Sequence, residues 1–212
     1  MTGAQALTML MARMNRTNAT LRANALLEMI QFQKMTLEKG AIMPDFLITR
    51  DASVTLTAAN RQFTLPTDFL RELDEDETLW ILDDDNIYHH MEKMDYEDGI
   101  DKWGSDATGD LPIDYNLTGL YGYTFPTPTV NRTLKMDYYA TGGTIADDTV
   151  ETVWLKHASD LIIGGTGAIV NALYVKDTEA AVMFSAMESA ARKRLDDEQT
   201  ARQEAGRSRR MG

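Results

Sequence analysis

Two series of apolar residues near the C-terminus constrain the fold of this chain more than any other feature. Both repeat at intervals of three and four residues, which is the spacing of one helix face. Lys176-Asp177-Thr178 separates them and supplies an N-cap for the second helix. We therefore predict an antiparallel helical hairpin over residues 148–195, whose apolar stripe needs a partner. The first series is Trp154, Ala158, Leu161, Ile162, Ile169, Ala172 and Leu173, and the second is Ala180, Met183, Phe184, Met187, Ala191 and Leu195.

The best candidate for that partner is the helical pattern at the other end of the chain. Residues 4–14 predict a short helix, and residues 20–39 predict a longer one that ends at Gly40. Phe32 and Met35 lie outside the main stripe of the longer helix, so it should be deeply buried or contact a second partner. Residues 1–49 and 148–195 are thus expected to form one helical platform.

Between the two helical parts, the apolar period changes to two, which is typical of β-strands. The predicted fold class is therefore α+β, with a small antiparallel β-structure over residues 50–147 inserted into the platform. The predicted strand pairs are a hairpin of 53–57 with 62–65, and a second of 78–82 with 86–90 across Asp83-Asp84-Asp85; further strands are expected at 121–125 and 134–139, and an irregular excursion at 94–119.

The negative charge of the chain is concentrated in one block. Residues 72–101 contain thirteen acidic side chains and one basic one, so this block carries −12, which equals the formal charge of the whole protein. A solvated region that aids solubility is the simplest interpretation. The alternatives are a cation site or a surface past which DNA slides without binding, because acidic surfaces repel phosphates. The candidates for such a DNA-facing surface are Asp74, Glu75, Asp76, Glu77, Asp83, Asp84 and Asp85.

No pattern in the sequence predicts catalysis, a cofactor or a metal site. Gly164-Gly165-Thr166-Gly167 lacks the Gly-Lys-Ser/Thr end of a phosphate loop and lies within a helical pattern, where it favours close approach of another helix or a kink. Asp83-Asp84-Asp85 lacks calcium-loop spacing, and His89 and His90 should point to opposite faces of a strand. We therefore expect no enzyme, although a metal-dependent hydrolase that uses the acidic block and an acidic DNA mimic remain alternatives.

The composition excludes several kinds of site and segment. The chain has no cysteine, so disulfides and thiolate metal sites are excluded. No apolar stretch is long enough for a membrane span and no signal peptide is apparent, so a soluble protein made in the cytoplasm is expected. Residues 196–212 form a polar, Arg-rich extension that has little to bury and should fray or order only on a partner. Its candidate partner-binding residues are Arg202, Arg207, Arg209 and Arg210.

Several segments together resemble the head–tail adaptor (connector, head-completion) proteins of tailed bacteriophages. These are Phe63-Thr-Leu-Pro-Thr-Asp-Phe-Leu70, Phe125-Pro-Thr-Pro128 and Thr133-Leu-Lys-Met-Asp-Tyr-Tyr139, followed by a glycine turn and a long helix. The resemblance covers residues 5 to 200 and lies in order and spacing. The acidic block and residues 94–119 are outside the shared pattern.

The resemblance implies a structural virion protein at the head–tail junction. Such adaptors assemble as a ring, commonly of twelve copies, beneath the portal, where they extend the DNA channel and provide the platform for tail attachment. The implied partners are further copies of the chain, the portal protein, and a tail or nozzle protein, with genomic DNA passing through unbound and no membrane. The implied portal-binding residues are Arg202, Arg207, Arg209 and Arg210. A nozzle or tail-completion protein is the alternative within the virion.

Overall fold

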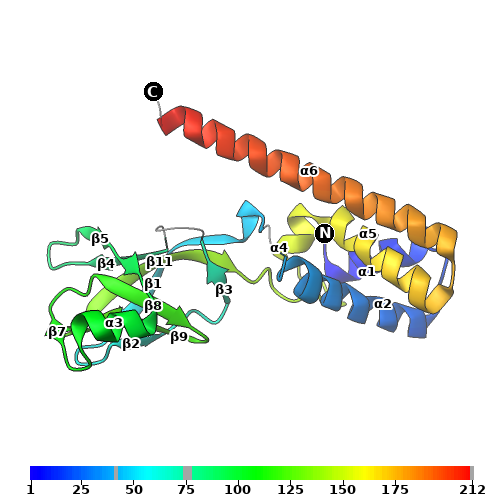
Figure 1. The fold of residues 1–212 in the computed structure, drawn as a ribbon. Coiled ribbons are helices and arrows are strands. Elements are labelled where there is room, and N and C mark those ends of the chain that lie inside the picture. Colours follow the sequence, from blue (N-terminus) through cyan, green and yellow to red (C-terminus); the bar gives the residue numbers. More distant parts are fainter. Residues whose placement is uncertain (41–42, 74–77, 211–212) are drawn as a thin grey trace. The chain divides into compact units, whose positions relative to one another are not determined.

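The computed structural model describes residues 1–40, 43–73 and 78–210, with side chains described as far as Ala201. The chain divides into two compact units (Figure 1): unit 1 is Met1–Leu47 with Gly142–Gly212, and unit 2 is Ile48–Thr141. Unit 1 is helical and unit 2 contains the strands. The predicted α+β class is confirmed.

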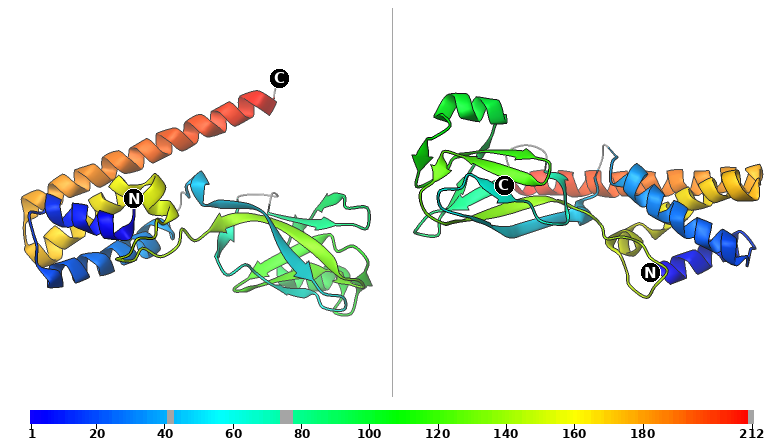
Figure 2. Two further views of the ribbon diagram at one scale, coloured as in Figure 1. Left: turned by 180° about the vertical axis from the view of Figure 1, so that it is seen from behind. Right: turned by 90° about the horizontal axis from the view of Figure 1, so that it is seen from below.

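Unit 1 is built from helices contributed by both ends of the chain (Figure 2). Thr2 caps α1 in a capping box with Gln5, and Asn18 caps α2 by accepting from the Leu21 N–H. The helices are α1 (Gly3–Arg13), α2 (Ala19–Gln31), the π-helical η1 (Phe32–Leu37), the 3₁₀ turn η2 (Asp45–Leu47), α4 (Val153–His157), α5 (Ser159–Val170), the π-helical η3 (Asn171–Val175) and α6 (Thr178–Arg210).

Helix α5 is the centre of unit 1. Every residue from Leu161 to Gly167 is buried, and α5 packs against α1, α2, α4 and α6. The prediction of an amphipathic helix with one apolar stripe was therefore wrong for α5, since a helix enclosed on all sides is apolar all round. The predicted partnership between the C-terminal hairpin and the N-terminal helices is confirmed by the packing of α5 against α1 and α2.

Helix α6 follows the predicted break. Lys176 adopts a left-handed conformation, and the Asp177 carboxylate accepts from the Ala180 N–H at 2.9 Å. Phe184 and Ala191 are buried, whereas Met183 of the predicted stripe is 58% exposed. We expected the chain to fray from residue 196, but α6 continues to Arg210. This expectation was wrong because α6 packs against α5, and a helix that is already nucleated can propagate at little further cost.

Within the described residues, unit 2 contains three sheets. The largest has the order β1-β11-β4-β5, with β3 also paired to β11; the second has the order β2-β9-β8-β6, and β7 pairs with β10. All pairs are antiparallel except β6 with β8 and β7 with β10. The elements are β1 (Ile48–Leu56), β2 (Gln62–Thr64), β3 (Phe69–Glu72), β4 (Leu79–Leu82), β5 (Tyr88–His90), β6 (Glu92–Lys93), α3 (Tyr96–Trp103), β7 (Thr108–Gly109), β8 (Asp114–Thr118), β9 (Tyr121–Phe125), β10 (Thr127–Pro128) and β11 (Arg132–Ala140).

One apolar core lies between the two larger sheets of unit 2. It includes Leu56 and Leu134 from the first sheet and Phe63 and Tyr115 from the second. The predicted β4–β5 hairpin is confirmed, with Trp80 opposite His90. The interpretation of residues 94–119 as irregular was wrong, because this range contains α3 and β8.

The predicted hairpin of residues 53–57 with 62–65 was also wrong. β1 pairs with β11, whereas β2 pairs with β9 in the other sheet. The chain therefore passes from one sheet to the other at this turn, and side chains of both strands still point into the shared core.

Candidate assembly surfaces

The acidic turn between β4 and β5 is held by its own carboxylates. One Asp83 oxygen accepts from the N–H groups of Asp85 and Ile87, both at 2.9 Å, and the other lies 2.7 Å from His89 Nε2. The His89 hydrogen bond, followed by the backbone hydrogen bonds, lowers the pKa of Asp83. Asp83 is therefore the residue that fixes the turn, whereas Asp85 is exposed.

Asp84 connects this turn to the start of β11. Its carboxylate lies 2.5 Å from Arg132 Nη1, and Arg132 Nε donates to the Asp110 carbonyl at 3.0 Å. The Arg132 side chain is 7% exposed and that of Asp84 is 90% exposed. Arg132 thus ties two loops to the start of β11, a role that the sequence did not suggest. The only sequence signal was a lone arginine at the start of an apolar strand.

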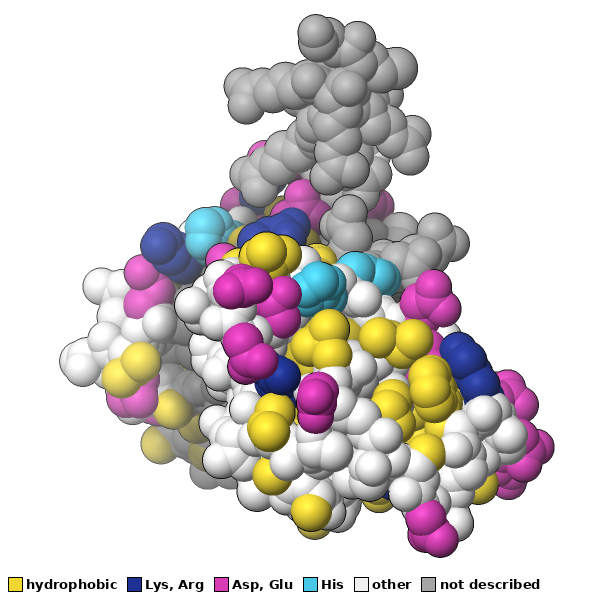
Figure 3. All heavy atoms as spheres, turned by 90° about the vertical axis from the view of Figure 1, so that its left-hand side faces the viewer, with side chains coloured by type: hydrophobic (Ala, Val, Ile, Leu, Met, Phe, Trp, Pro, Cys, Tyr) yellow, Lys and Arg dark blue, Asp and Glu magenta, His cyan; other side chains and the backbone are white. Residues whose placement is uncertain are grey.

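The rest of the acidic block is dispersed over several elements. Glu72 on β3 pairs with Lys93 on β6 at 2.9 Å, and Glu97 and Asp98 lie in the first turn of α3, where acidic residues favour a helix N-terminus. Asp74, Glu75, Asp76 and Glu77 lie outside the described residues. Figure 3 shows acidic and hydrophobic side chains interspersed on one face of unit 2.

The C-terminal part of α6 is the second predicted surface. Helix α6 has 33 residues and α5 has 12, so α6 extends beyond its antiparallel partner. Gln199 Nε2 donates to the Met43 carbonyl at 2.9 Å, and the helix continues past this contact. The main chain of Arg202, Arg207, Arg209 and Arg210 belongs to α6, while their side chains lie outside the described part of the chain.

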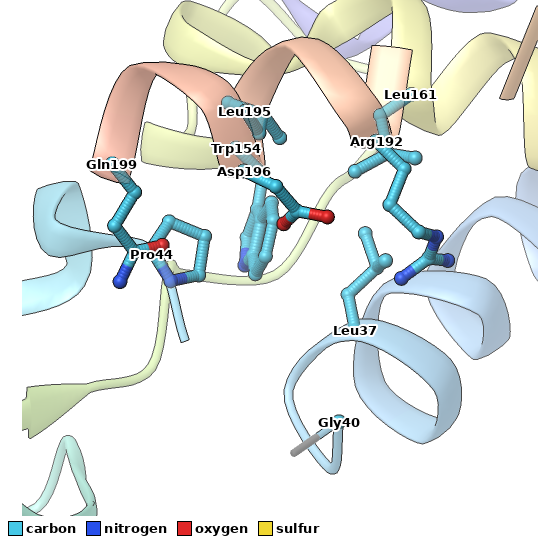
Figure 4. Close-up of a pocket in the computed structure, with 9 residues that line it drawn as sticks. All are labelled: Leu37, Gly40, Pro44, Trp154, Leu161, Arg192, Leu195, Asp196 and Gln199. Atoms are coloured by element: carbon cyan, nitrogen blue, oxygen red, sulfur yellow. The ribbon is translucent and has the colours of Figure 1, made fainter. Parts of the chain in front are cut away.

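A cavity of about 250 Å³ lies beside the same helix (Figure 4). Leu37, Leu161 and Leu195 give it apolar walls, and Arg192 and Asp196 bring charged groups to it from α6. Gly40 also lines this cavity and adjoins the two undescribed residues 41–42. Because its wall continues into residues outside the described ranges, we assign no ligand to this cavity.

The glycines of α5 permit close helix packing. A Cβ atom at Gly164 would lie 2.7 Å from the Glu188 backbone nitrogen on α6, so no side chain fits there. This confirms the interpretation of close approach and gives Gly164-Gly165-Thr166-Gly167 a packing role. His157 stacks on Phe46 with ring centroids 5.0 Å apart. Among the described residues, no three His, Asp or Glu side chains are grouped so that they could hold a metal ion.

Comparison with known proteins assigns the chain to a family. The model of the SU10 adaptor protein family matches residues 1–212. The chain belongs to this family. The predicted resemblance to phage head–tail adaptors is thereby confirmed, and this adaptor is a structural component of the virion that interacts with other head or tail proteins. The family is one of structural adaptors rather than a known enzyme family.

One further comparison and one property of the helices complete the description of this adaptor. A search of curated proteins finds no match. Within the described ranges, none of the helices combines the length and the apolar character that crossing a membrane requires.

Two of the three segments that carried the resemblance to adaptors, residues 63–70 and 133–139, meet in the structure. The Tyr138 hydroxyl on β11 donates to the Asp68 carboxylate at 2.7 Å, and the Thr141 N–H donates to the Asp68 carbonyl at 2.8 Å. Burial, followed by the Asp68 hydrogen bond, raises the pKa of Tyr138 to about 12. Asp68 of the Leu-Pro-Thr-Asp-Phe segment therefore fastens the end of β11.

Proposed function

We propose that this adaptor forms a ring beneath the portal, extends the DNA channel and provides the platform for tail attachment. The full-length family match is the observation that carries this proposal. In this arrangement, residues 1–49 and 148–195 form the helical platform, residues 50–147 form the β insert, and residues 196–212 are the extension that docks. A ring of twelve copies is the expected assembly.

The portal-binding role is proposed for Arg202, Arg207, Arg209 and Arg210. Helix α6 carries their main chain beyond the Gln199 contact, and guanidinium groups pair well with carboxylates of a protein partner. A helix that is already formed loses less conformational entropy on docking than an unfolded tail does. This supports α6 as the docking element.

The channel-lining role is proposed for Asp83, Asp84 and Asp85, together with residues 74–77. Asp84 and Asp85 are exposed, and their charge would keep DNA phosphates at a distance. Because Asp83 and Asp84 also hold the turn, their charge is fixed in position. A ring reconstruction that places these carboxylates on the outer face would refute the channel role and leave the adaptor role intact.

The test is negative-stain imaging of the adaptor mixed with the portal ring of the same virus. The expected result is an added layer of density with the rotational symmetry of the portal. Deletion of residues 202–212 keeps the Gln199 contact and should abolish the layer, and so should a variant with all four arginines changed to Gln. The matched control is Arg16→Gln, which removes an exposed arginine from the α1–α2 turn and should dock normally.

Two outcomes would overturn this proposal. Normal docking of the four-arginine variant would show that α6 is not the portal-binding element. Binding to a preformed adaptor–portal complex, without binding to the portal alone, would instead identify a nozzle or tail-completion protein.

A further inference from the structure

The largest sheet of unit 2 has two unpaired edges. In the order β1-β11-β4-β5, β1 and β5 are terminal, and within the described residues no strand pairs with the outer side of either one (Figure 1). Unpaired strand edges present free backbone N–H and C=O groups that can pair with another chain. β1 is nine residues long, so its edge is substantial.

The outer edge of β1 is unpaired because β2, the next strand in the chain, pairs with β9 in the other sheet. After the turn that follows β1, the chain joins the other sheet, and the two segments diverge. A shallow groove of about 490 Å³ lies between them, lined by Ala52–Thr55 on one side and Thr64–Thr67 on the other. Val54, Leu65 and Pro66 give this groove an apolar lining next to the free edge. Such a groove fits an extended strand.

The opposite edge presents exposed apolar side chains. Tyr88 on β5 is 51% exposed, and Ile87 just before it is 56% exposed. Natural proteins protect edge strands by keeping them short, as β5 is with its three residues, or with lysine, proline or a covering loop. Residues 87–90, Ile-Tyr-His-His, contain neither lysine nor proline. The β5 edge is therefore suited to a protein contact.

We propose that β5 of a second copy of this chain pairs with β1 in the groove, so that the sheet continues from one subunit to the next. This inference rests on the proposed ring. A ring needs a heterologous contact between two different surfaces of the same chain, and the two edges of one sheet provide such a pair. Three successive antiparallel pairings make β5 antiparallel to β1. A rotated copy that continues the sheet would therefore form a further antiparallel pair.

The pleat of the sheet restricts the register of this contact. Val54, Leu134, Ile81 and His89 lie opposite one another across the four strands and share the core face. Ser53 and His90 belong to the other face, because successive residues of a strand alternate. Pairing Val54 with His89 of the next copy keeps each face continuous, and it places Ser53 beside His90.

Engineered disulfides test this register directly, since the chain contains no cysteine. Within one chain, Ser53 and His90 are separated by three strand spacings, roughly 14 Å. This exceeds the distance of about 7 Å that a disulfide can bridge, so any bond must join two copies. The Ser53→Cys/His90→Cys variant is mixed with portal rings, oxidised and run on a non-reducing gel. The matched control is Ala52→Cys/His90→Cys, which keeps the His89–Asp83 contact and places the first thiol on the other face of the sheet.

The expected result is a ladder of cross-linked species that ends at the closed ring, with at least about tenfold less product from the control. The Ile87→Lys/Tyr88→Lys variant, which changes two exposed side chains, should weaken assembly on the portal by at least about tenfold. A ring visible by imaging, without cross-linking beyond that of the control, would overturn the inference and leave the proposed function standing. Absence of both the ring and the cross-link would overturn the proposed ring and the proposed strand pairing.

Discussion

Glu38 offers the sharpest test of how unit 1 holds the returning chain. The residue is 6% exposed, and one oxygen of its carboxylate accepts three hydrogen bonds. The donors are Gln33 Nε2 at 2.7 Å, Trp154 Nε1 at 3.2 Å and the Gly142 N–H at 3.3 Å. Glu38 thus joins the end of η1 to α4 and to the first residue after unit 2. A buried acceptor shared by three donors should be costly to remove.

The magnitude follows from the donors that Glu38→Leu leaves without an acceptor. Gln33 Nε2 also donates to the Gly143 carbonyl, so it keeps one partner. Among the described residues, Glu38 is the acceptor that both the Gly142 N–H and Trp154 Nε1 use. Each buried donor left unsatisfied costs about 1–3 kcal/mol, so Glu38→Leu should lower the free energy of unfolding by about 2–6 kcal/mol. Glu38→Gln keeps an acceptor oxygen and should cost less, about 1–2 kcal/mol.

Urea unfolding followed by helical circular dichroism measures this loss, because most of the described helix lies in unit 1. A double-mutant cycle with Trp154→Phe isolates one hydrogen bond, since the phenylalanine ring removes the orphaned donor. The double variant should be less destabilised than the sum of the single variants by about 1–3 kcal/mol. Strict additivity, or wild-type stability of Glu38→Leu, would show that this carboxylate is not a structural acceptor.

Three further predictions concern packing and titration. Gly164→Val should separate α5 from α6 and lower the melting temperature sharply, whereas Ser185→Val on the exposed side of α6 should change it little. The neutral Tyr138 hydroxyl, whose pKa is raised, contributes to the free energy of unfolding fully below pH 10, and this contribution should be lost as pH rises towards about 12. Tyr138→Phe should remove the part of the phenolate absorbance that appears at the highest pH. A titration without that change contradicts the assignment. Because the pKa of Asp83 is lowered, its carboxylate contributes to the free energy of unfolding above pH 3.8, and this contribution is lost as pH falls through the pKa of Asp83 in the folded protein. The NMR shifts of the Asp85 and Ile87 amides should report the midpoint of this titration. A midpoint above pH 3.8 would refute the prediction.

Periodicity predicted the elements that bury one face and expose the other. The α6 stripe and the β4–β5 turn could be located because both combine a clear period with a capping aspartate, Asp177 in one case and Asp83 in the other. Helix α5 was harder to describe, since a helix that is buried all round has no polar face to reveal its orientation.

Strand pairing could not be predicted in the same way. Val54 and Phe63 alternate with polar neighbours and flank a turn, which is also the pattern of a hairpin. They join different sheets because both can reach one shared core, and the choice depends on β9 and β11, which lie far along the chain. The Arg132 contact is equally non-local, since its partners Asp84 and Asp110 are remote in sequence.

The pairing of β1 with β11 has a mechanical consequence. Unit 2 is attached to the rest of the chain through Ile48 and through the residues after Ala140, and Ile48 lies opposite Tyr139. Tension applied through these two connections would pull the antiparallel strands apart from one end, so their hydrogen bonds would be loaded singly and not together. The Asp68 contacts with Tyr138 and Thr141 lie at the end where such peeling would begin. Because β1 and β3 pair with opposite sides of β11, these contacts hold the end of β11 in place and leave the β1 pairing as the one that separates first.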